Sequence, residues 1–457
     1  MQQDSGADRR GNLPDGFRWG VSTSSYQIEG AVTEGGRGQS IWDTFTHAGD
    51  RVTDESTGDT ACDHYHRYRD DVALMADLGV NAYRFSIAWP RIQPTGRGPA
   101  NSAGVDFYDR LVDALLERGI DPVATLYHWD LPQALQDQGG WTVRATAEAF
   151  ADYADVVAGA LGDRVKMWIT VNEPVIHTFL GHFWGMHAPG LNILDEGLFA
   201  VTHHQLLGHG LAVAALRARS SSPVAIANNY SPAWAVGPDG ERDSATDADR
   251  AAAAAFDMLN NRLYTDPILL GHYPEGAGVV EGEGPVRDGD LAIIAAPIDA
   301  LGVNYYNPSG VGEPSGGLPL PYDMRMLAGF PTTYFGWPVV PDGLRELLVS
   351  LKDRYGDSLP ELYITESGCA YEDVPGPDGV VRDTDRIAYL DGHTAAVVAA
   401  IDEGVRVGGY FVWSLMDNFE WAEGFSKRFG LVHVDFDSQR RTPKASYHWY
   451  RDRIANS

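Results

Sequence analysis

Short runs of β-branched and aromatic residues alternate with amphipathic helical patterns along the chain, and this alternation limits the fold more than any other feature. The runs expected to form strands are residues 17–22, 82–87, 122–127, 165–171, 224–228, 300–305, 362–365 and 409–413. The helical patterns between them cover residues 70–78, 107–118, 147–161, 207–217, 247–264, 344–355 and 387–403. Strands that alternate with helices pair in parallel, and eight of them are the number that closes a (β/α)8 barrel. The sequence therefore predicts an α/β fold of the (β/α)8 TIM barrel type.

The predicted barrel forms a single domain. A length of 457 residues would suggest about three domains at about 150 residues each, but α/β barrels routinely exceed that length as one unit. No composition shift or Pro/Ser-rich linker divides the chain, and the Gly- and Pro-rich pieces 278–284, 310–321 and 374–379 are predicted to be surface loops. We expect a flexible N-terminal tail over residues 1–12 and one barrel domain over residues 13–457, with long loops at the C-terminal face of the barrel.

Charge limits the partners of the chain. Lys and Arg number 35 against 63 Asp and Glu, which gives a net charge of −28. Such an excess repels phosphates and anionic lipids, so we expect no nucleic-acid partner and no membrane partner. No run of about 18 apolar residues occurs, and residues 1–12 lack the apolar core of a secretory signal. A cytoplasmic enzyme that acts on small neutral molecules is expected, and homo-oligomer formation stays open.

The sequence predicts neither a metal site nor a cofactor. Cys62, His64 and His66 lie close together, but the two histidines cannot face the same side of a helix and no second ligand pair follows. His203 has no nearby carboxylate or thiolate in the sequence. A phosphate-binding Gly-x-x-x-x-Gly-Lys-Ser/Thr loop is also absent from the sequence.

Two of the predicted strands end in a glutamate. Residues 166–174 read Lys-Met-Trp-Ile-Thr-Val-Asn-Glu-Pro, and Pro174 removes the donor that the next ladder position needs, so Glu173 lies at the carboxyl end of its strand. Glu366 follows the run 362–365 in the same way. Each could be an ordinary strand-end carboxylate that faces water. In a parallel barrel, however, this end holds the active site, so the two glutamates suggest a paired-carboxylate mechanism.

Aromatic and hydrogen-bonding side chains follow every predicted strand except the fifth. They are Ser24-Ser25-Tyr26-Gln27, Ala88-Trp89-Pro90-Arg91, Tyr127-His128-Trp129-Asp130, Asn304-Tyr305-Tyr306, Trp413-Ser414 and Asn418-Phe419-Glu420-Trp421. A carbohydrate needs this combination, because its C–H faces stack on rings and its hydroxyls need donors and acceptors in fixed directions.

Taken in order, these pieces resemble glycoside hydrolase family 1, the β-glucosidase family. The matching segments are 17–20 (Phe-Arg-Trp-Gly), 25–30 (Ser-Tyr-Gln-Ile-Glu-Gly), 83–87 (Tyr-Arg-Phe-Ser-Ile), 127–130 (Tyr-His-Trp-Asp), 170–174 (Thr-Val-Asn-Glu-Pro), 187–190 (His-Ala-Pro-Gly), 302–306 (Gly-Val-Asn-Tyr-Tyr), 364–366 (Ile-Thr-Glu), 413–421 (Trp-Ser-Leu-Met-Asp-Asn-Phe-Glu-Trp) and 426–430 (Ser-Lys-Arg-Phe-Gly). The resemblance covers essentially the whole chain after the first dozen residues.

The resemblance implies a retaining, exo-acting β-glucosidase that releases terminal non-reducing β-D-glucosyl residues from cellobiose and other β-glucosides. Glu173 would be the general acid/base and Glu366 the nucleophile of a double displacement. Retention needs carboxyl groups about 5–5.5 Å apart. At that distance and an effective dielectric near 20, two charges repel by about 3 kcal/mol, or roughly two pKa units. Repulsion by Glu366 would therefore keep Glu173 protonated.

The resemblance also implies the supporting residues. Arg84 and Tyr306 would keep Glu366 anionic, although Arg84 could equally form a structural ion pair. Asn172 would donate to the sugar 2-hydroxyl, and Asn304 would orient its neighbours. The remaining substrate-binding residues implied are Gln27, His128, Trp129, Trp337, Trp413, Glu420, Trp421 and Phe429. A core role for His128 and a loop-packing role for Trp337 stay open.

Two positions bear on specificity. Glu420 would repel a 6-phosphate, so an unphosphorylated β-glycoside is expected. Ser367 stands where the family usually has Asn, which leaves rate or specificity open, and Cys369 is expected near the pocket rim. Alternatives are a preference for β-fucosides or β-galactosides, transglycosylation that outruns hydrolysis, and a catalytically silent sugar-binding protein.

Overall fold

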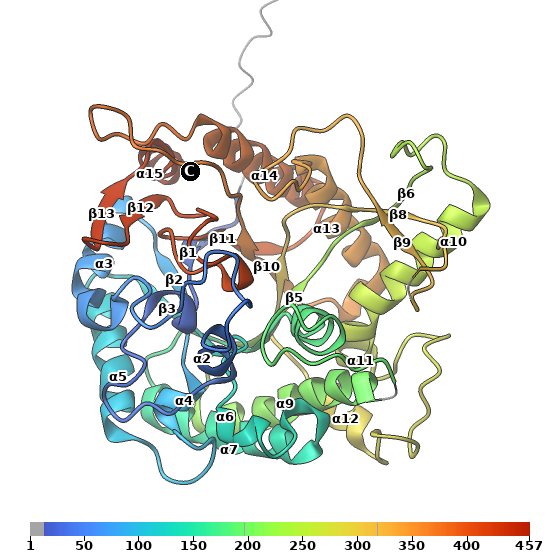
Figure 1. The fold of residues 1–457 in the computed structure, drawn as a ribbon, viewed down its shortest axis with the longest axis horizontal. Coiled ribbons are helices and arrows are strands. Elements are labelled where there is room, and N and C mark those ends of the chain that lie inside the picture. Colours follow the sequence, from blue (N-terminus) through green and yellow to red (C-terminus); the bar gives the residue numbers. More distant parts are fainter. Residues whose placement is uncertain (1–12, 196, 318) are drawn as a thin grey trace, which may run out of the picture.

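Eight parallel strands close into a barrel at the centre of the computed structural model, which describes residues 13–195, 197–317 and 319–457 (Figure 1). The strands are β1 (Arg18–Ser22), β2 (Ala82–Ser86), β3 (Asp121–Tyr127), β4 (Met167–Asn172), β5 (Val224–Asn229), β7 (Ala300–Asn304), β10 (Glu361–Ser367) and β11 (Val407–Trp413). They pair in the closed order β1-β11-β10-β7-β5-β4-β3-β2. Each corresponds to one of the eight predicted runs, so the (β/α)8 barrel is confirmed. The predicted tail, residues 1–12, lies outside the described residues.

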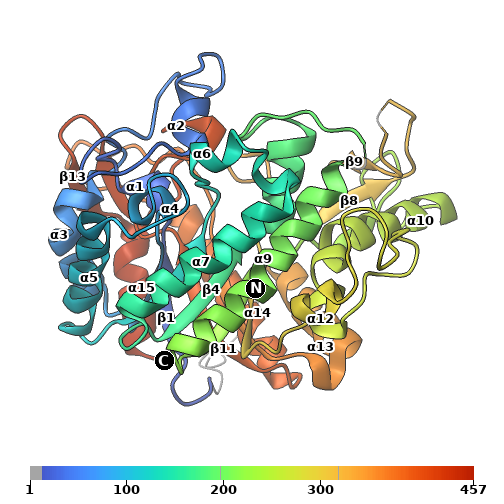
Figure 2. The ribbon, with the colours of Figure 1, turned by 90° about the horizontal axis from the view of Figure 1, so that it is seen from below.

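Helices surround the barrel, with shorter ones at the strand ends (Figure 1). The longer helices are α3 (His64–Leu78), α5 (Ser102–Leu116), α7 (Arg144–Leu161), α9 (Gly197–Arg219), α10 (Asp247–Phe256), α13 (Pro341–Tyr355), α14 (Thr384–Asp402) and α15 (Ala445–Ala455). The shorter ones are α1 (Ser25–Ile28), α2 (Ile41–Thr46), α4 (Trp89–Ile92), α6 (Gln133–Gln136), α8 (Pro174–Ile176), α11 (Asp266–Leu270) and α12 (Asp290–Ile294). Helices α7 and α9 pack side by side on the outside of the barrel (Figure 2). None of the helices in the described residues is long and apolar enough to span a membrane.

The barrel interior is filled by side chains. A separate buried cluster consists of Ala82, Val123, Met167, Ile169, Ala225, Ala227, Ala300, Tyr363 and Phe411. The alanines leave room for the larger rings. Gly20 is needed for the same reason, because a Cβ there would lie 2.3 Å from the ring of Phe411. The interior is therefore a packed core, as expected for this fold.

The strand pairing becomes irregular where the two glutamates occur. The register of β10 against β7 shifts between Ile364 and Glu366, and that of β4 against β5 shifts between Ile169 and Asn172. Such irregularities redirect side chains and are common beside active sites. Both irregularities lie near the C-terminal face of the barrel, where Glu173 and Glu366 occur.

Some predicted boundaries were wrong. Residues 310–321 were predicted as a loop, but β8 (Ser309–Gly312) pairs with β6 (Ala233–Ala235) and β9 (Asp323–Arg325) in a three-stranded sheet. One partner, β6, is distant in the chain, and the glycines of β8 gave no sign of a strand. The helical pattern 247–264 divides into α10, the π-helix η3 (Asp257–Asn261) and the 3-10 helix η4 (Arg262–Tyr264). Strands β12 (Val432–Asp435) and β13 (Arg440–Pro443) form a further hairpin, and short helical segments occur at η1 (Gly140–Thr142), η2 (His177–Phe183), η5 (Gly356–Ser358) and η6 (Trp421–Glu423).

Candidate active site

A cavity of about 580 Å³ opens at the carboxyl ends of the barrel strands and contains both glutamates. Of the residues predicted for the site, those that line it are His128, Trp129, Glu173, Tyr306, Trp337, Glu366, Trp413, Glu420, Trp421 and Phe429. They come from segments between residues 128 and 429 and meet only because the barrel is closed. The cavity is within the size range that holds small organic ligands.

Glu366 is held by a cation and a phenol. The Arg84 guanidinium donates to Glu366 Oε1 at 2.5 Å, and the Tyr306 hydroxyl donates to Oε2 at 2.7 Å. Arg84 is fully buried and Glu366 is 3 % exposed. Each carboxylate oxygen of Glu366 thus accepts one hydrogen bond from these two donors. The sequence left two roles open for Arg84, support of Glu366 and a structural ion pair, and the two are compatible. Its guanidinium contacts Glu366 and also donates to the Thr365 carbonyl, which links β2 to β10.

Glu173 has neutral donors instead. Amide groups of Asn229 and Asn304 donate to its Oε1 at 3.0 and 2.8 Å. Burial, and after it the charge of Glu366, raises the pKa of Glu173 to about 8. The pKa of Glu173 is raised, as expected from the sequence. Burial, however, raises it more than the repulsion by Glu366, which was the expected cause.

Two asparagines connect the glutamates. Asn304 donates to Asn172 Oδ1 at 3.0 Å, and Arg84 donates to the same oxygen at 2.6 Å. A continuous chain of hydrogen bonds therefore runs from Glu173 through Asn304, Asn172 and Arg84 to Glu366. Asn172, Asn304 and Arg84 are buried, and their hydrogen bonds fix the two acids relative to each other.

Glu420 is a third acid in the cavity. Gln27 donates to Glu420 Oε2 at 3.3 Å and to the Phe419 carbonyl at 2.9 Å. Burial, followed by the charges of Glu366 and Glu173, raises the pKa of Glu420 to about 8. Gln27 itself is fully buried, and the Ser24 hydroxyl donates to its amide oxygen at 2.6 Å. Gln27 thus supports Glu420 from behind the cavity wall.

Aromatic rings gather on the Glu420 side of the cavity. The ring of His128 stacks on Trp413 at 5.8 Å and on Trp421 at 5.9 Å, and Trp129 lies 4.7 Å from Trp421. Burial lowers the pKa of His128 well below its usual value, so the ring is neutral. The Asn172 amide donates to its Nε2 at 3.0 Å, which leaves the proton on Nδ1. That buried Nδ1 has no hydrogen-bond partner among the described residues.

On the other side, Phe335 and Trp337 stack at 4.3 Å, and Trp337 lies 6.2 Å from Phe429. Trp337 thus packs in a loop and lines the cavity at once. Trp129, Glu173 and Trp421 all have φ near the left-handed region, at 78°, 46° and 50°. Non-glycine residues rarely adopt this conformation, and they do so most often at functional sites.

Asn229 is the functional residue that the sequence argument missed. It ends β5, the one strand from which no site residue was expected, and it contacts the acid Glu173 directly. The signal was present, since Asn228-Asn229 follows a β-rich run as Asn172-Glu173 does.

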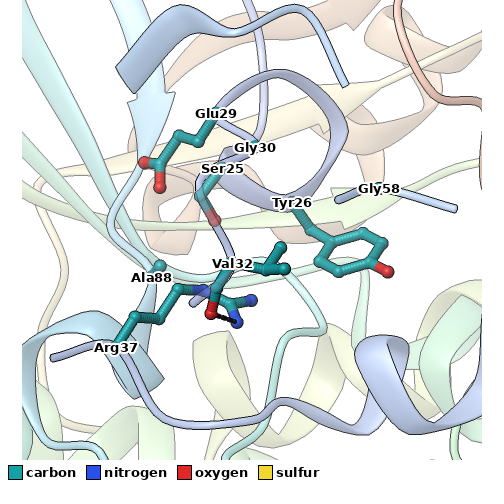
Figure 3. Close-up of a pocket in the computed structure, with 8 residues that line it drawn as sticks. All are labelled: Ser25, Tyr26, Glu29, Gly30, Val32, Arg37, Gly58 and Ala88. Atoms are coloured by element: carbon teal, nitrogen blue, oxygen red, sulfur yellow. Dashed lines mark hydrogen bonds between the residues drawn. The ribbon is translucent and has the colours of Figure 1, made fainter. Parts of the chain in front are cut away.

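A narrow second pocket is lined by Ser25 and Tyr26 of α1 and by residues of neighbouring segments (Figure 3). It shares no lining residue with the main cavity. In it, Arg37 donates to the Val32 carbonyl at 3.3 Å. Nearby, the Ser25 hydroxyl donates to buried Asp130 at 2.7 Å, and burial raises the pKa of Asp130 to about 7. These groups support the segments that carry Gln27 and Trp129.

Among the described residues, no group of three or more His, Cys, Asp or Glu side chains could hold a metal ion. His64 pairs with Asp71, and His203 pairs with Asp290 at 3.0 Å. The expectation that His203 lacks a carboxylate was wrong, because Asp290 comes from a distant helix. Cys369 is fully buried rather than at the pocket rim.

Known proteins that are similar to this chain are glycoside hydrolases. The sequence model of glycosyl hydrolase family 1 matches residues 9–457. A β-glucosidase A from Acetivibrio thermocellus is 44 % identical over 451 residues, covering 97 % of this chain and 98 % of the relative. A bifunctional β-D-glucosidase/β-D-fucosidase from Bifidobacterium breve is 47 % identical over 468 residues, covering 97 % and 98 %. The solved structure of a psychrophilic β-glucosidase from Micrococcus antarcticus superposes with a TM-score of 0.92 at 44 % identity, covering 98 % of each chain.

Proposed function

Since this chain belongs to glycosyl hydrolase family 1, we propose that it is a retaining, exo-acting β-glucosidase in which Glu366 is the nucleophile and Glu173 the acid/base. Its substrates are small β-glycosides, with residues 13–457 acting as one catalytic domain. The observation that carries the proposal is the contrast between the two acids. Glu366 is held by a guanidinium and a phenol, whereas Glu173 is held by neutral amides and has a pKa raised to about 8.

In the first step, a carboxylate oxygen of Glu366 attacks the anomeric carbon while the bond to the leaving oxygen breaks. Glu173 gives its proton to that oxygen, so the aglycone departs as a neutral alcohol. Both amide donors reach Oε1 of Glu173, so the proton belongs on Oε2. The product of this step is a glucosyl ester of Glu366.

In the second step, water attacks the anomeric carbon and the ester bond to Glu366 breaks. The ester carries no charge, so the pKa of Glu173 falls and its carboxylate can accept the proton of the water. Arg84 and Tyr306 receive the returning negative charge on Glu366. The sugar leaves with its original β configuration after two inversions.

The sugar itself would bind on the Glu420 side. Trp413 is the stacking platform, and Glu420 and Trp421 meet the hydroxyls. Gln27 holds Glu420 in place from behind the wall, and Trp129 packs against Trp421. His128 presents Nδ1–H as a donor, and a remaining N–H of Asn172 meets the 2-hydroxyl. A 6-phosphate would face Glu420, so an unphosphorylated sugar is favoured.

The test is a Glu366→Gly variant assayed with nitrophenyl β-D-glucoside. We expect hydrolysis to fall by about 10³-fold or more, because the ester can no longer form. A 2-fluoro-2-deoxyglucoside should label Glu366 in the parent protein, as peptide mass spectrometry would detect. Parent-like hydrolysis by Glu366→Gly would contradict the mechanism, and glycoside binding by the parent without hydrolysis would favour the silent sugar-binding alternative.

A second activity, on β-fucosides, is supported by the bifunctional relative from Bifidobacterium breve. Fucose lacks the 6-hydroxyl and has the opposite configuration at C4, so its contacts on the Glu420 side differ from those of glucose at two positions. Rates on nitrophenyl β-D-glucoside, β-D-fucoside and β-D-galactoside, with product analysis at high sugar concentration, would rank these activities and reveal glycosyl transfer.

A further inference from the structure

The cavity extends beyond the two glutamates into an outer part that has two apolar walls. One wall follows β4 through α8 and η2 and contributes Ile176, Phe179, Leu180, Trp184 and Met186. Another wall comes from α10 and the segment that leads into β9, and contributes Phe256, Leu320, Tyr322 and Met324. Elements α10, β8 and β9 lie together at one side of the barrel (Figure 1). We call these two walls the apolar vestibule.

The polar groups beside the vestibule already have partners. Asn260 donates to the Phe256 carbonyl at 3.3 Å and to the Tyr322 hydroxyl at 3.1 Å. Asn261 exchanges hydrogen bonds with the Ser231 backbone, donating at 3.1 Å and accepting at 3.3 Å. A second sugar ring at this place would lose water from its hydroxyls and find few free partners, which is costly.

The charged residues that line the cavity also favour an uncharged leaving group. None of the described residues that line the cavity is Lys or Arg, while Glu173, Glu366, Glu420 and Glu423 all line it. Lys427 lies 3.8 Å from Glu423 and 4.1 Å from the Tyr334 ring, outside the lining. An anionic leaving group would therefore find no cation in the lining to pair with.

Two methionines of the vestibule are exposed in the free protein. Met186 is 59 % and Met324 is 58 % exposed. An apolar ligand would remove this surface from water, and the flexible methionine side chain adapts to ligands of different shape. The vestibule therefore gains most from a large apolar group.

We propose that the apolar vestibule selects β-glucosides whose leaving group is a large, uncharged, apolar alcohol, in preference to cellobiose. The proposal rests on the proposed function, since it assigns the leaving-group side of that same site. It places the apolar group of the alcohol between η2 and β9, with its oxygen within reach of Glu173.

The experiment compares kcat/KM of the full chain for methyl, butyl and octyl β-D-glucoside, below micelle-forming concentrations, and for cellobiose. The primary alkanols have nearly equal acidity, so the chemistry stays constant while the buried area grows. Complete burial of a methylene should raise kcat/KM about fourfold, and half burial about twofold. With seven more methylenes half buried, kcat/KM for octyl glucoside should exceed that for methyl glucoside by about 10²-fold. The kcat/KM for octyl glucoside should also exceed that for cellobiose.

Variants locate the effect. Met186→Ser/Met324→Ser should lower the ratio of kcat/KM for octyl glucoside to that for methyl glucoside by about tenfold, because serine buries less apolar area against the octyl chain. Met326→Ser is the matched control: Met326 is 71 % exposed, lies two residues from Met324 and does not line the cavity, so its ratio should equal that of the parent.

The outcomes separate the two proposals. If alkyl and nitrophenyl glucosides are all left intact, the proposed function fails and this inference fails with it. If nitrophenyl glucoside is hydrolysed but kcat/KM is flat from methyl to octyl, or cellobiose exceeds octyl glucoside, only the vestibule proposal is overturned. If the double variant still prefers octyl glucoside to methyl glucoside as strongly as the parent does, the apolar group does not bind at the vestibule.

Discussion

Two buried clusters of charge lie near the same end of the barrel, and they differ in balance. Behind the loops after β10 and β11, three aspartates meet three cations: Asp373, Asp383 and Asp417 with Arg386, Arg428 and Lys444. Of the four glutamates that line the cavity, Glu423 lies near Lys427, whereas Glu173, Glu366 and Glu420 share one cation, Arg84, which pairs with Glu366. We call the first the balanced cluster.

The difference in balance decides the protonation of each cluster. Burial alone would raise the pKa of Asp417, but the charges of Lys444 and Arg428 outweigh it and lower that pKa. In the cavity the single guanidinium pairs with Glu366, and the pKa of Glu173 and of Glu420 rises to about 8. Charge balance thus suits a structural role, and charge imbalance provides a proton to transfer.

The largest expected effect is on catalysis. Glu173→Gln keeps the shape of the side chain but removes the proton donor, so kcat/KM on alkyl glucosides should fall by about 10²- to 10⁴-fold. In the parent, kcat/KM should decline above about pH 8, where Glu173 loses its proton. A pH–rate profile of the variant that kept this alkaline limb would assign the limb to another group.

The next effect is on stability. Lys444→Met leaves Asp373 and Asp417 buried beside one cation fewer, so the free energy of unfolding should fall by about 3–5 kcal/mol, as measured by urea denaturation. Lys352→Met is the control, since Lys352 is partly exposed and should change stability by less than about 0.5 kcal/mol. Equal decreases in the free energy of unfolding of the two variants would mean that the ion pairs of Lys444 stabilise the fold no more than a partly exposed lysine does.

The pH dependence of stability should have opposite signs in the two clusters. The pKa of Glu173 is raised from 4.5 to about 8, so the folded state holds more protons between these values and its stability falls as pH rises. Asp417 has a lowered pKa, so its contribution is present above its unfolded pKa and is lost as pH falls. Urea denaturation from pH 5 to 8 should therefore show a shallower decline for Glu173→Gln than for the parent, by up to about 1.4 kcal/mol per pH unit. Parallel curves would contradict the raised pKa.

The smallest effect concerns Cys369, whose carbonyl accepts a hydrogen bond from Arg386 of the balanced cluster. Burial raises the pKa of its thiol to about 12, so the folded protein should resist iodoacetamide at pH 8 and be labelled only after unfolding. Mass spectrometry of the Cys369 peptide measures this. Rapid labelling with loss of activity, prevented by substrate, would mean that the cysteine lies near the cavity after all.

The barrel strands were predictable because their signal is local. Strands buried on both faces read as continuous apolar runs, and the residues that follow them must meet at one end of a closed barrel. Glu173, Glu366, His128 and Trp421 could therefore be grouped before any coordinates were known.

Contacts between distant segments could not be predicted. Nothing around Lys444 indicates that its ammonium will lie between Asp373 and Asp417. The same is true of Asn229, whose role depends on the register of β5 beside β4. The order of causes behind the pKa of Glu173 also depends on burial, which a distance-based estimate between two charges omits.

The side chains that fill the barrel, with Phe411 against Gly20, close the route from the glutamates toward the opposite end. In the proposed mechanism, the departing alcohol and the incoming water must then pass through the same mouth, one after the other. An alcohol that lingers there blocks the water and can recapture the sugar from its ester. How fast the first product escapes therefore sets how often the ester is hydrolysed and how often it returns to the starting glycoside.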